Sequence, residues 1–193
     1  MVHDARERIL SACERVIASA GLRGFRMQEV ARQADVSIGL LAYHFGDRDG
    51  LMQAALDHVT AAAVDRARGV PEHAPAADRL AALLCSEFGD SEAIRSGSIA
   101  WNEVRAAAVF EAAPAGAVSR STESWQRTVE ALVREAVREA ADRGPVGDPA
   151  GLALILTSLV EGLSGRWLTG QLSAGEAQAA VRAALEGLGF RLS

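Results

Sequence analysis

The sequence predicts an all-α protein of about nine helices. Alanine and other strong helix formers dominate most windows, and aromatic residues make up only 5% of the chain. Apolar residues recur at spacings of three and four, which is typical of helices, and no segment alternates in the manner of a strand. We expect the helices at 4–20, 27–34, 38–45, 47–68, 76–88, 91–112, 117–143, 149–169 and 173–188.

The first two expected helices each carry one apolar face. The stripe of the first consists of Ile9, Leu10, Cys13, Val16, Ile17 and Ala20. Gly21 and Gly24 are expected to end it, because glycine is the common residue just past a helix end. The second helix is short and places Met27, Val30, Ala31 and Ala34 inward.

The expected helices at 38–45 and 47–68 follow the second helix closely. The short helix at 38–45 is therefore expected to lie between two tight turns. Asp35 and Val36 form the first turn, and Ser37 can cap the helix at 38–45 by accepting a hydrogen bond from a first-turn N–H. Gly46 breaks that helix, and Asp47 caps the longer one that follows.

The later helices have their own boundary signals. The segment Pro71–Pro75 (PEHAP) interrupts the helix-forming composition and is the best candidate for a linker. Asp148 followed by Pro149 marks one helix start, since proline is favoured at the first helical position. Ser173 with Glu176 forms a capping box that opens the last helix.

Composition excludes several classes of protein. The charged N-terminus lacks the apolar region of a secretory signal, and no uninterrupted apolar segment of ~18 residues is present. Cys13 and Cys85 lie far apart on apolar faces, so we expect buried reduced thiols, consistent with a cytoplasmic protein. The four histidines show no metal-ligand spacing, and no nucleophile elbow, Walker loop or dinucleotide motif occurs. We therefore expect no metal, no cofactor and no catalysis.

The formal charge of −5 is unevenly distributed. Residues 1–50 contain seven arginines and seven acidic residues, so the rest of the chain carries the whole negative excess. Arginine supplies every fixed positive side-chain charge, because the chain contains no lysine, and its fork of donors suits phosphate groups. An N-terminal part without net charge, followed by an acidic remainder of the chain, is a weak indication that the N-terminal part faces DNA.

The helix pair at 27–34 and 38–45 has the arrangement of a helix-turn-helix, in which the second helix enters the major groove of DNA. Gly39 would allow close approach to DNA, while Leu41 and Phe45 would face the protein core. The outward positions are Ser37, Ile38, Leu40, Tyr43 and His44. On spacing alone, a three-helix packing unit without nucleic acid remains an equal alternative.

A resemblance favours the DNA-binding interpretation. The stretch from Arg6 to Leu56 resembles the DNA-binding domain of the tetracycline-repressor (TetR) family, through the glycine break at 21 and 24, the VA pair at 30–31, A-x-V-S-x-G at 34–39 and the HF pair at 44–45. The resemblance implies an N-terminal three-helix DNA-binding domain at residues 1–50 and a C-terminal helical ligand-binding and dimerisation domain at residues 51–193. It also implies a homodimer on a palindromic operator. Arg26 replaces the usual Ser or Thr, and Ala42 replaces a frequent Tyr. The DNA-binding residues it implies here are Arg26, Gln28, Ser37, Ile38, Gly39, Leu40, Tyr43, His44 and Arg48.

The C-terminal domain contains candidate ligand-binding residues, all expected in helices. They are Phe88, Trp101, Glu103, Phe110, Trp125 and Glu161. For each aromatic residue the alternative is an ordinary role in the core. The segments 101–103 and 159–163 are also loosely similar to choline-responsive repressors of the TetR family, which implies a small hydrophobic or cationic effector bound by cation–π attraction.

The last two helices, within residues 149–188, are expected to form the homodimer interface. The first has an apolar side with Leu152, Ile155, Leu156, Leu159, Leu163 and Trp167, and a small-residue side with Ser158, Gly162 and Gly165. It is apolar around too much of its circumference for a surface helix. A monomer core is the alternative. The resemblance thus implies a ligand-responsive repressor that is released from DNA by its effector. An enzyme and a helical interaction module are the weaker alternatives.

Overall fold

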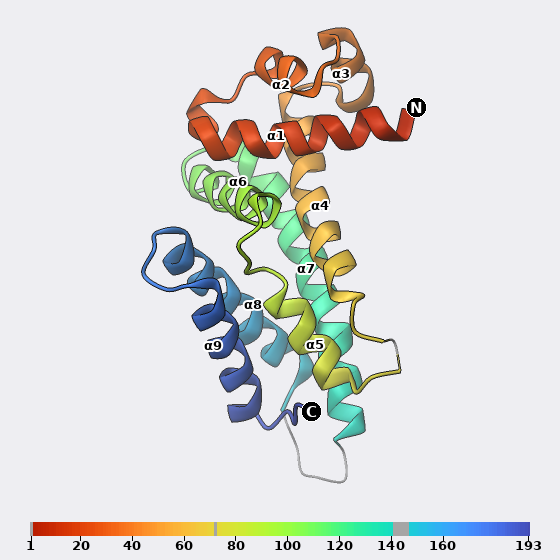
Figure 1. Ribbon diagram of the computed structural model, residues 1–193, viewed down its shortest axis with the longest axis vertical. Helices are drawn as coiled ribbons and strands as arrows, with labels where there is room; N and C mark the ends of the chain where they lie inside the picture. Colours follow the sequence, from red (N-terminus) through yellow and green to blue (C-terminus); the bar gives the residue numbers. More distant parts are fainter. Residues whose placement is uncertain (1, 72, 141–146) are drawn as a thin grey trace. The chain divides into compact units, whose positions relative to one another are not determined.

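The computed structural model describes residues 2–71, 73–140 and 147–193 (Figure 1). Within these ranges the backbone forms nine helices and no strand, which confirms the predicted all-α fold. The helices are α1 (Val2–Gly24), α2 (Met27–Ala34), α3 (Ile38–Phe45), α4 (Arg48–Ala67), α5 (Ala76–Cys85), α6 (Glu92–Ala108), α7 (Ala112–Glu139), α8 (Pro149–Leu168) and α9 (Ala174–Gly187).

The chain forms two compact units, here called unit 1 and unit 2. Unit 1 comprises residues 1–61 and 91–122, and unit 2 comprises residues 62–90 and 123–193. Unit 1 therefore contains α6 and the first part of α7 as well as the N-terminal helices. The functional boundary expected at residue 50 stays a prediction.

Unit 1 is built around α1, which packs against α2 on one side and α6 on the other (Figure 1). The predicted α1 stripe is buried from Ile9 to Ile17, but Ala20 is exposed. Directly after Ala20 the helix is interrupted at Gly21, whose backbone has φ 64° and ψ 173°. The stripe joins a core with Phe25, Val30, Leu41, Leu51, Met52, Leu56 and Val104. Each large aliphatic side chain buried in this way contributes about 1.5–3 kcal/mol.

The turn between α3 and α4 depends on a close backbone approach. Gly46 ends α3 with a positive φ of 73°, a conformation that glycine adopts without a steric cost. The Asp47 carboxylate then accepts hydrogen bonds from the backbone N–H groups of Asp49 (3.1 Å) and Gly50 (2.9 Å), as predicted for a helix cap. A Cβ atom on residue 50 would lie only 2.1 Å from the carbonyl oxygen of Phe45. Glycine at position 50 is therefore required for α4 to start where it does.

Unit 2 contains α5, α8 and α9, with α9 packed against both of the others. Phe88 and Trp167 meet edge to face in its core, with ring centroids 5.8 Å apart. The predicted start signals are confirmed: Asp148 accepts a hydrogen bond from the N–H of Gly151 (2.9 Å), and Ser173 and Glu176 form the capping box. Both cysteines are free and buried, and burial raises the pKa of each thiol.

Several helix boundaries differ from the prediction. The helix α1 runs to Gly24 rather than residue 20, with non-helical backbone at Gly21 inside it. The helix α5 ends at Cys85 rather than residue 88, and α6 ends at Ala108 rather than residue 112. The helix α7 begins at Ala112, ahead of the predicted residue 117, with Pro114 in its first turn. Proline is tolerated there because first-turn N–H groups have no partner within the helix. The predicted end of this helix at residue 143 lies outside the described residues, as does residue 72 of the expected linker between α4 and α5.

A histidine with two carboxylate partners joins α4 to α1 inside unit 1. The Nδ1 atom of His58 lies 2.6 Å from Glu14, which is buried, and its Nε2 atom lies 2.9 Å from Glu7. The hydrogen bond with Glu14 is the main reason that the pKa of His58 is raised above 6.5, against the opposing effect of burial. The protonated imidazole therefore links the two helices as a cation between two acids.

The pKa of His58 makes the contribution of this cluster to stability depend on pH. A raised folded-state pKa means that the contribution is complete below the unfolded-state value and is lost as pH rises through the folded-state value. The variant His58→Gln keeps a donor but loses the charge. We expect its free energy of unfolding to be lower than that of the unsubstituted protein by about 1–2 kcal/mol at acidic pH, and by less at alkaline pH.

Urea unfolding at both pH values measures this difference, with His73→Gln, an exposed histidine, as the control. A deficit for His58→Gln that is the same at both pH values would contradict the charged assignment.

Candidate nucleic-acid interface

The turn between α2 and α3 is held by backbone and side-chain hydrogen bonds. Asp35 ends α2 in the left-handed conformation (φ 54°), and the N–H of Val36 donates to the carbonyl of Ala31 (3.0 Å). Aspartate tolerates this conformation better than most residues. The Ser37 hydroxyl accepts from the N–H of Leu40 (3.1 Å), which confirms the predicted cap. The start of α3 is therefore held firmly against α2.

The helix α3 has one face in the core and one in solvent. Leu41 is fully buried and Phe45 packs against the same core, as the sequence predicted. On the other side Tyr43 is 83% exposed, Ile38 46% and Leu40 36%. Gly39 is also exposed, whereas His44 is half-buried with its ring against that of Tyr43.

The exposed tip of α3 thus combines methyl groups with one phenolic hydroxyl. Methyl groups can pack on the thymine methyl in the major groove, and a hydroxyl can donate to a phosphate or a base edge. Exposed isoleucine and leucine side chains gain no free energy from contact with water. An apolar contact with DNA would therefore favour this surface.

The start of α2 lacks the cap that a Ser or Thr would provide. Arg26 has an extended backbone and makes no side-chain capping bond. Its Nη1 atom instead donates to the carbonyl oxygens of Arg23 and Phe25, both at 2.9 Å. The replacement of the usual Ser or Thr by Arg26 therefore leaves α2 without a side-chain cap. Gln28, two residues further along the chain, is exposed.

Arg48 lies at the first position of α4. Its guanidinium is 5.6 Å from the centroid of the Phe25 ring, which is itself buried. Arginine stacks on aromatic faces while keeping its donors available at the edge of the plane. This contact holds Arg48 near the start of α2.

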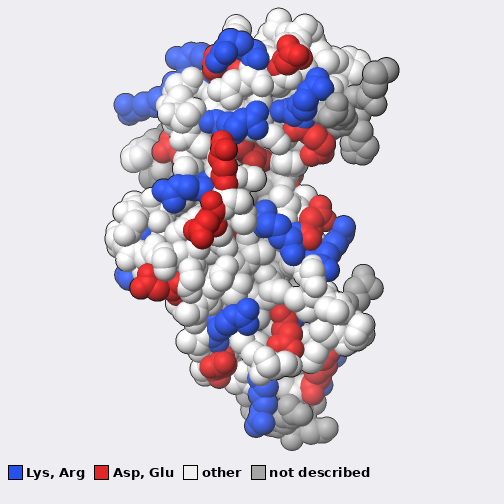
Figure 2. All heavy atoms as spheres, in the orientation of Figure 1, with Lys and Arg blue, Asp and Glu red and all other residues white. Residues whose placement is uncertain are grey.

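The surface of this region is more basic than its composition indicates. Glu14 is buried beside His58, Glu29 is paired with Arg32, and Asp47 caps α4. Six of the seven arginines in residues 1–50 are exposed, and Arg48 is half-buried. In Figure 2 arginine and acidic side chains both lie on this part of the surface. Glu7, Asp35, Asp47 and Asp49 are exposed as well, and Arg32 is paired with Glu29, so the positive excess of this surface is small.

The predicted ligand-binding residues are divided between the units. In unit 1, Trp101 packs partly buried against the core, and the Glu103 carboxylate accepts a hydrogen bond from the N–H of Leu22 (2.9 Å). Phe110 is 87% exposed. In unit 2, Phe88 and Trp125 are buried and Glu161 is half-buried.

The expectation that all of these residues lie in helices is wrong for two of them. Phe88 follows the end of α5, and Phe110 lies in the turn after α6. The N–H of Phe110 bonds to the carbonyl of Ala107 and that of Phe88 to Cys85, as in the tight turns that close helices. The ligand-binding roles of all six residues stay predictions.

Sequence reasoning missed two residues of this region. Gly50 acts through a long-range backbone contact, for which no local pattern exists. Arg23 lines a cavity together with Arg26 and Arg48, but it lies in the irregular end of α1, where periodicity carries no information.

The part of the chain that the structure describes contains neither a metal-binding group of side chains nor a membrane-spanning helix. No three His, Cys, Asp or Glu side chains there are grouped so as to hold a metal ion. None of the described helices is long and apolar enough to cross a membrane.

Family models match both parts of the chain. The model of bacterial regulatory proteins of the tetR family matches residues 9–55, and that of the C-terminal part of BetI-type transcriptional repressors matches residues 75–189. Among curated relatives, the HTH-type transcriptional regulator BetI of Burkholderia mallei is 38% identical over 90 residues, which cover 45% of this chain and 46% of the relative. The alignment thus spans about half the length of such relatives. BetI of Burkholderia ambifaria is 29% identical over 188 residues, 94% of this chain and 88% of the relative.

Solved structures agree with these matches. A TetR-family regulator from Rhodococcus sp. is 36% identical with a TM-score of 0.88, over 96% of this chain and 98% of the other. A transcriptional regulator from Saccharomonospora viridis, solved in complex with choline, is 23% identical with a TM-score of 0.75, over 95% and 96%. This second likeness concerns the fold alone. The resemblance noted in the sequence is confirmed, and the chain belongs to the TetR family of bacterial transcriptional regulators, with a C-terminal part of the BetI repressor type.

Proposed function

We propose that the protein is a ligand-responsive repressor that binds a palindromic DNA operator as a homodimer in the cytoplasm. The observation that carries this proposal is the exposed tip of α3, where Ile38, Leu40 and Tyr43 face solvent on a helix held by the Ser37 cap. A helix so held can enter the major groove without rearrangement.

Each proposed contact has a distinct task at the DNA. Ile38 and Leu40 would pack on thymine methyl groups, with Gly39 between them allowing close approach. Tyr43 and His44 would donate to phosphate or base edges. The remaining contacts would position the protein on phosphates, and they come from Arg26, Gln28, Ser37 and Arg48. Specificity would therefore depend more on methyl contacts than on bidentate hydrogen bonds.

Replacement of Tyr43 by Ala tests the assignment of this face. We expect operator affinity to fall about tenfold or more, because a good contact in the groove is worth ~1–3 kcal/mol. Tyr43→Phe, which loses only the hydroxyl, separates hydrogen bonding from packing. The control is Arg127→Ala, which removes an exposed charge from unit 2 and should leave affinity unchanged. Fluorescence anisotropy at fixed salt measures all four proteins, and equal affinities would refute the assignment.

The homodimer would form through α8 and α9. Leu154 and Ile155 are each 54% exposed on α8, and Ser158 and Gly162 continue the same face along the helix. Exposed small residues of α9, including Ala179 and Ala183, allow a second helix to approach closely. Two such pairs would make a four-helix bundle, since a two-fold interface uses the same patch on both chains. The dimer would place the two α3 helices ~34–36 Å apart, one turn of DNA.

The effector proposed for the protein is a small cationic or hydrophobic molecule. The similarity to BetI-type repressors and to a regulator solved with choline supports a quaternary ammonium compound. The proposed contacts in unit 1 are Trp101, Glu103 and Phe110, and those in unit 2 are Phe88, Trp125 and Glu161. Aromatic faces attract such cations, and carboxylates balance their charge. The effector would act by binding one arrangement of the dimer better than the other, at a typical coupling of ~1–3 kcal/mol.

Calorimetric titration of the protein tests the cationic effector. Choline, betaine aldehyde and longer alkylammonium compounds are the ligands, and 3,3-dimethylbutan-1-ol is the neutral isostere of choline. We expect heat of binding from at least one cation and none from the isostere. Flat titrations with every cation would exclude this effector class.

A further inference from the structure

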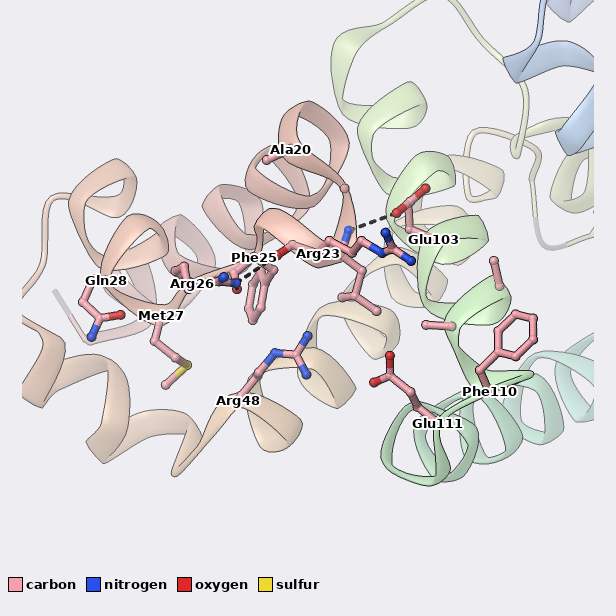
Figure 3. Close-up of a pocket in the computed structure, with 14 residues that line it drawn as sticks. Ala20, Arg23, Phe25, Arg26, Met27, Gln28, Arg48, Glu103, Phe110 and Glu111 are labelled. Atoms are coloured by element: carbon pink, nitrogen blue, oxygen red, sulfur yellow. Dashed lines mark hydrogen bonds between the residues drawn. The ribbon is translucent and has the colours of Figure 1, made fainter.

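A cavity of about 810 Å³ lies within unit 1 (Figure 3). Its lining includes Arg26, Gln28 and Arg48, proposed above as DNA contacts, and Glu103 and Phe110, proposed above as effector contacts. The end of α1, the loop to α2 and the first residues of α2 form one wall. Arg48 of α4 and the C-terminal end of α6 form the others. We call it the arginine cavity, because Arg23, Arg26 and Arg48 all line it.

The polar groups of the arginine cavity favour an anion. Three guanidinium groups from three different segments and two carboxylates line the cavity, so the lining has a positive excess. The Arg26 guanidinium already donates to the carbonyl oxygens of Arg23 and Phe25. Glu103 is engaged with the N–H of Leu22, which leaves Glu111 as the carboxylate directed into the open part (Figure 3). Arginine binds carboxylate, sulfonate and phosphate groups through its fork of donors.

The apolar part of the cavity defines the body of the ligand. Leu22 and Phe25 are buried beneath it, and Met27 and Ala107 lie beside them. Phe110 stands at the rim with most of its ring in water, a position that an apolar ligand would cover. Pockets for small molecules commonly combine such walls with a few placed polar groups.

We propose that the arginine cavity binds a small organic anion with an aromatic or aliphatic body, and that the bound anion competes with DNA phosphate for Arg26 and Arg48. The second half rests on the proposed function, in which these two arginines position the protein on DNA. Such an anion would release the operator directly at the DNA-binding unit.

The first experiment measures anion binding by the full chain without DNA. The probe is 8-anilinonaphthalene-1-sulfonate, whose fluorescence rises when it leaves water. We expect Arg23→Gln to weaken binding about three- to fivefold and Glu111→Gln to strengthen it by a similar factor, as for exposed charge pairs. Arg15→Gln removes an exposed charge elsewhere on α1 and should leave the dissociation constant unchanged. Displacement by 2-naphthoate, but not by the neutral 2-naphthamide, supports the requirement for charge.

Two results would overturn the site: equal dissociation constants for all four proteins, or equal weakening by Arg15→Gln and Arg23→Gln.

The second experiment repeats duplex binding at constant ionic strength with and without 2-naphthoate. We expect the anion to weaken duplex binding by the unsubstituted protein and to do so less for Arg23→Gln. An anion that binds the cavity without affecting duplex binding overturns the competition. A protein that binds no duplex contradicts the proposed function, while the probe titration still decides the cavity.

Discussion

Replacement of Ile155 by Glu is expected to convert the protein from a dimer to a monomer. Ile155 is 54% exposed in a single chain and lies at the centre of the proposed α8 interface, so a carboxylate there would be buried against its own copy. Burial of two facing like charges costs far more than the packing of one isoleucine contributes. Sedimentation should show about twice 20.3 kDa for the unsubstituted protein and 20.3 kDa for the variant.

Operator affinity should fall with the dimer. Two linked DNA-binding domains bind a two-half-site operator about 10²–10⁴-fold more tightly than one domain alone. The monomeric variant should therefore bind an operator at least ~100-fold more weakly than the dimer. The control is Ala131→Glu, which adds the same charge to an exposed position of α7 in unit 2. A dimeric Ile155→Glu protein, or a monomeric unsubstituted protein, would refute the proposed interface.

Replacement of Gly50 by Ala is expected to have the largest effect on stability. The new Cβ atom would lie 2.1 Å from the carbonyl oxygen of Phe45, so the backbone of the α3–α4 turn must move. Overpacking of this kind costs about 1–3 kcal/mol, or more where backbone atoms are involved. For a chain of this size the melting temperature should fall by ~2–4 °C for each kcal/mol.

Gly175→Ala is the matched control for this prediction. Residue 175 is also in a helix, but a Cβ atom there meets nothing within 4 Å. Because alanine is the better helix former, this variant should be as stable as the unsubstituted protein or slightly more stable. Equal melting temperatures for Gly50→Ala and Gly175→Ala would contradict the close approach.

Local sequence signals predicted most of the helices. Caps have a short-range cause, and Ser37, Asp148 and Ser173 each bond to an N–H three residues later, as expected from sequence. Apolar spacing likewise predicted the burial of Leu41. These features could be predicted because each depends on residues within one or two helical turns.

Other features depend on residues that are distant in sequence or on weak local preferences. The stretch from 106 to 118 is rich in helix-forming alanine, so nothing local marks the break that leaves Phe110 in a turn. The hydrogen bond from Leu22 to Glu103 and the arrangement of the arginine cavity join segments about eighty residues apart. Sequence predicted the residue types of the candidate site but not which of them lie together.

We propose that the exposed face of α3 binds DNA sequence-specifically. Selection of duplexes from a random pool tests this claim most directly. The full chain and the Tyr43→Ala variant would be incubated separately with the same pool, and bound duplexes sequenced after several rounds. The proposed function predicts that the unsubstituted protein enriches a palindrome with two half-sites one helical turn apart or a multiple, and that Tyr43→Ala enriches it poorly. A pool that remains random with the unsubstituted protein would contradict the account.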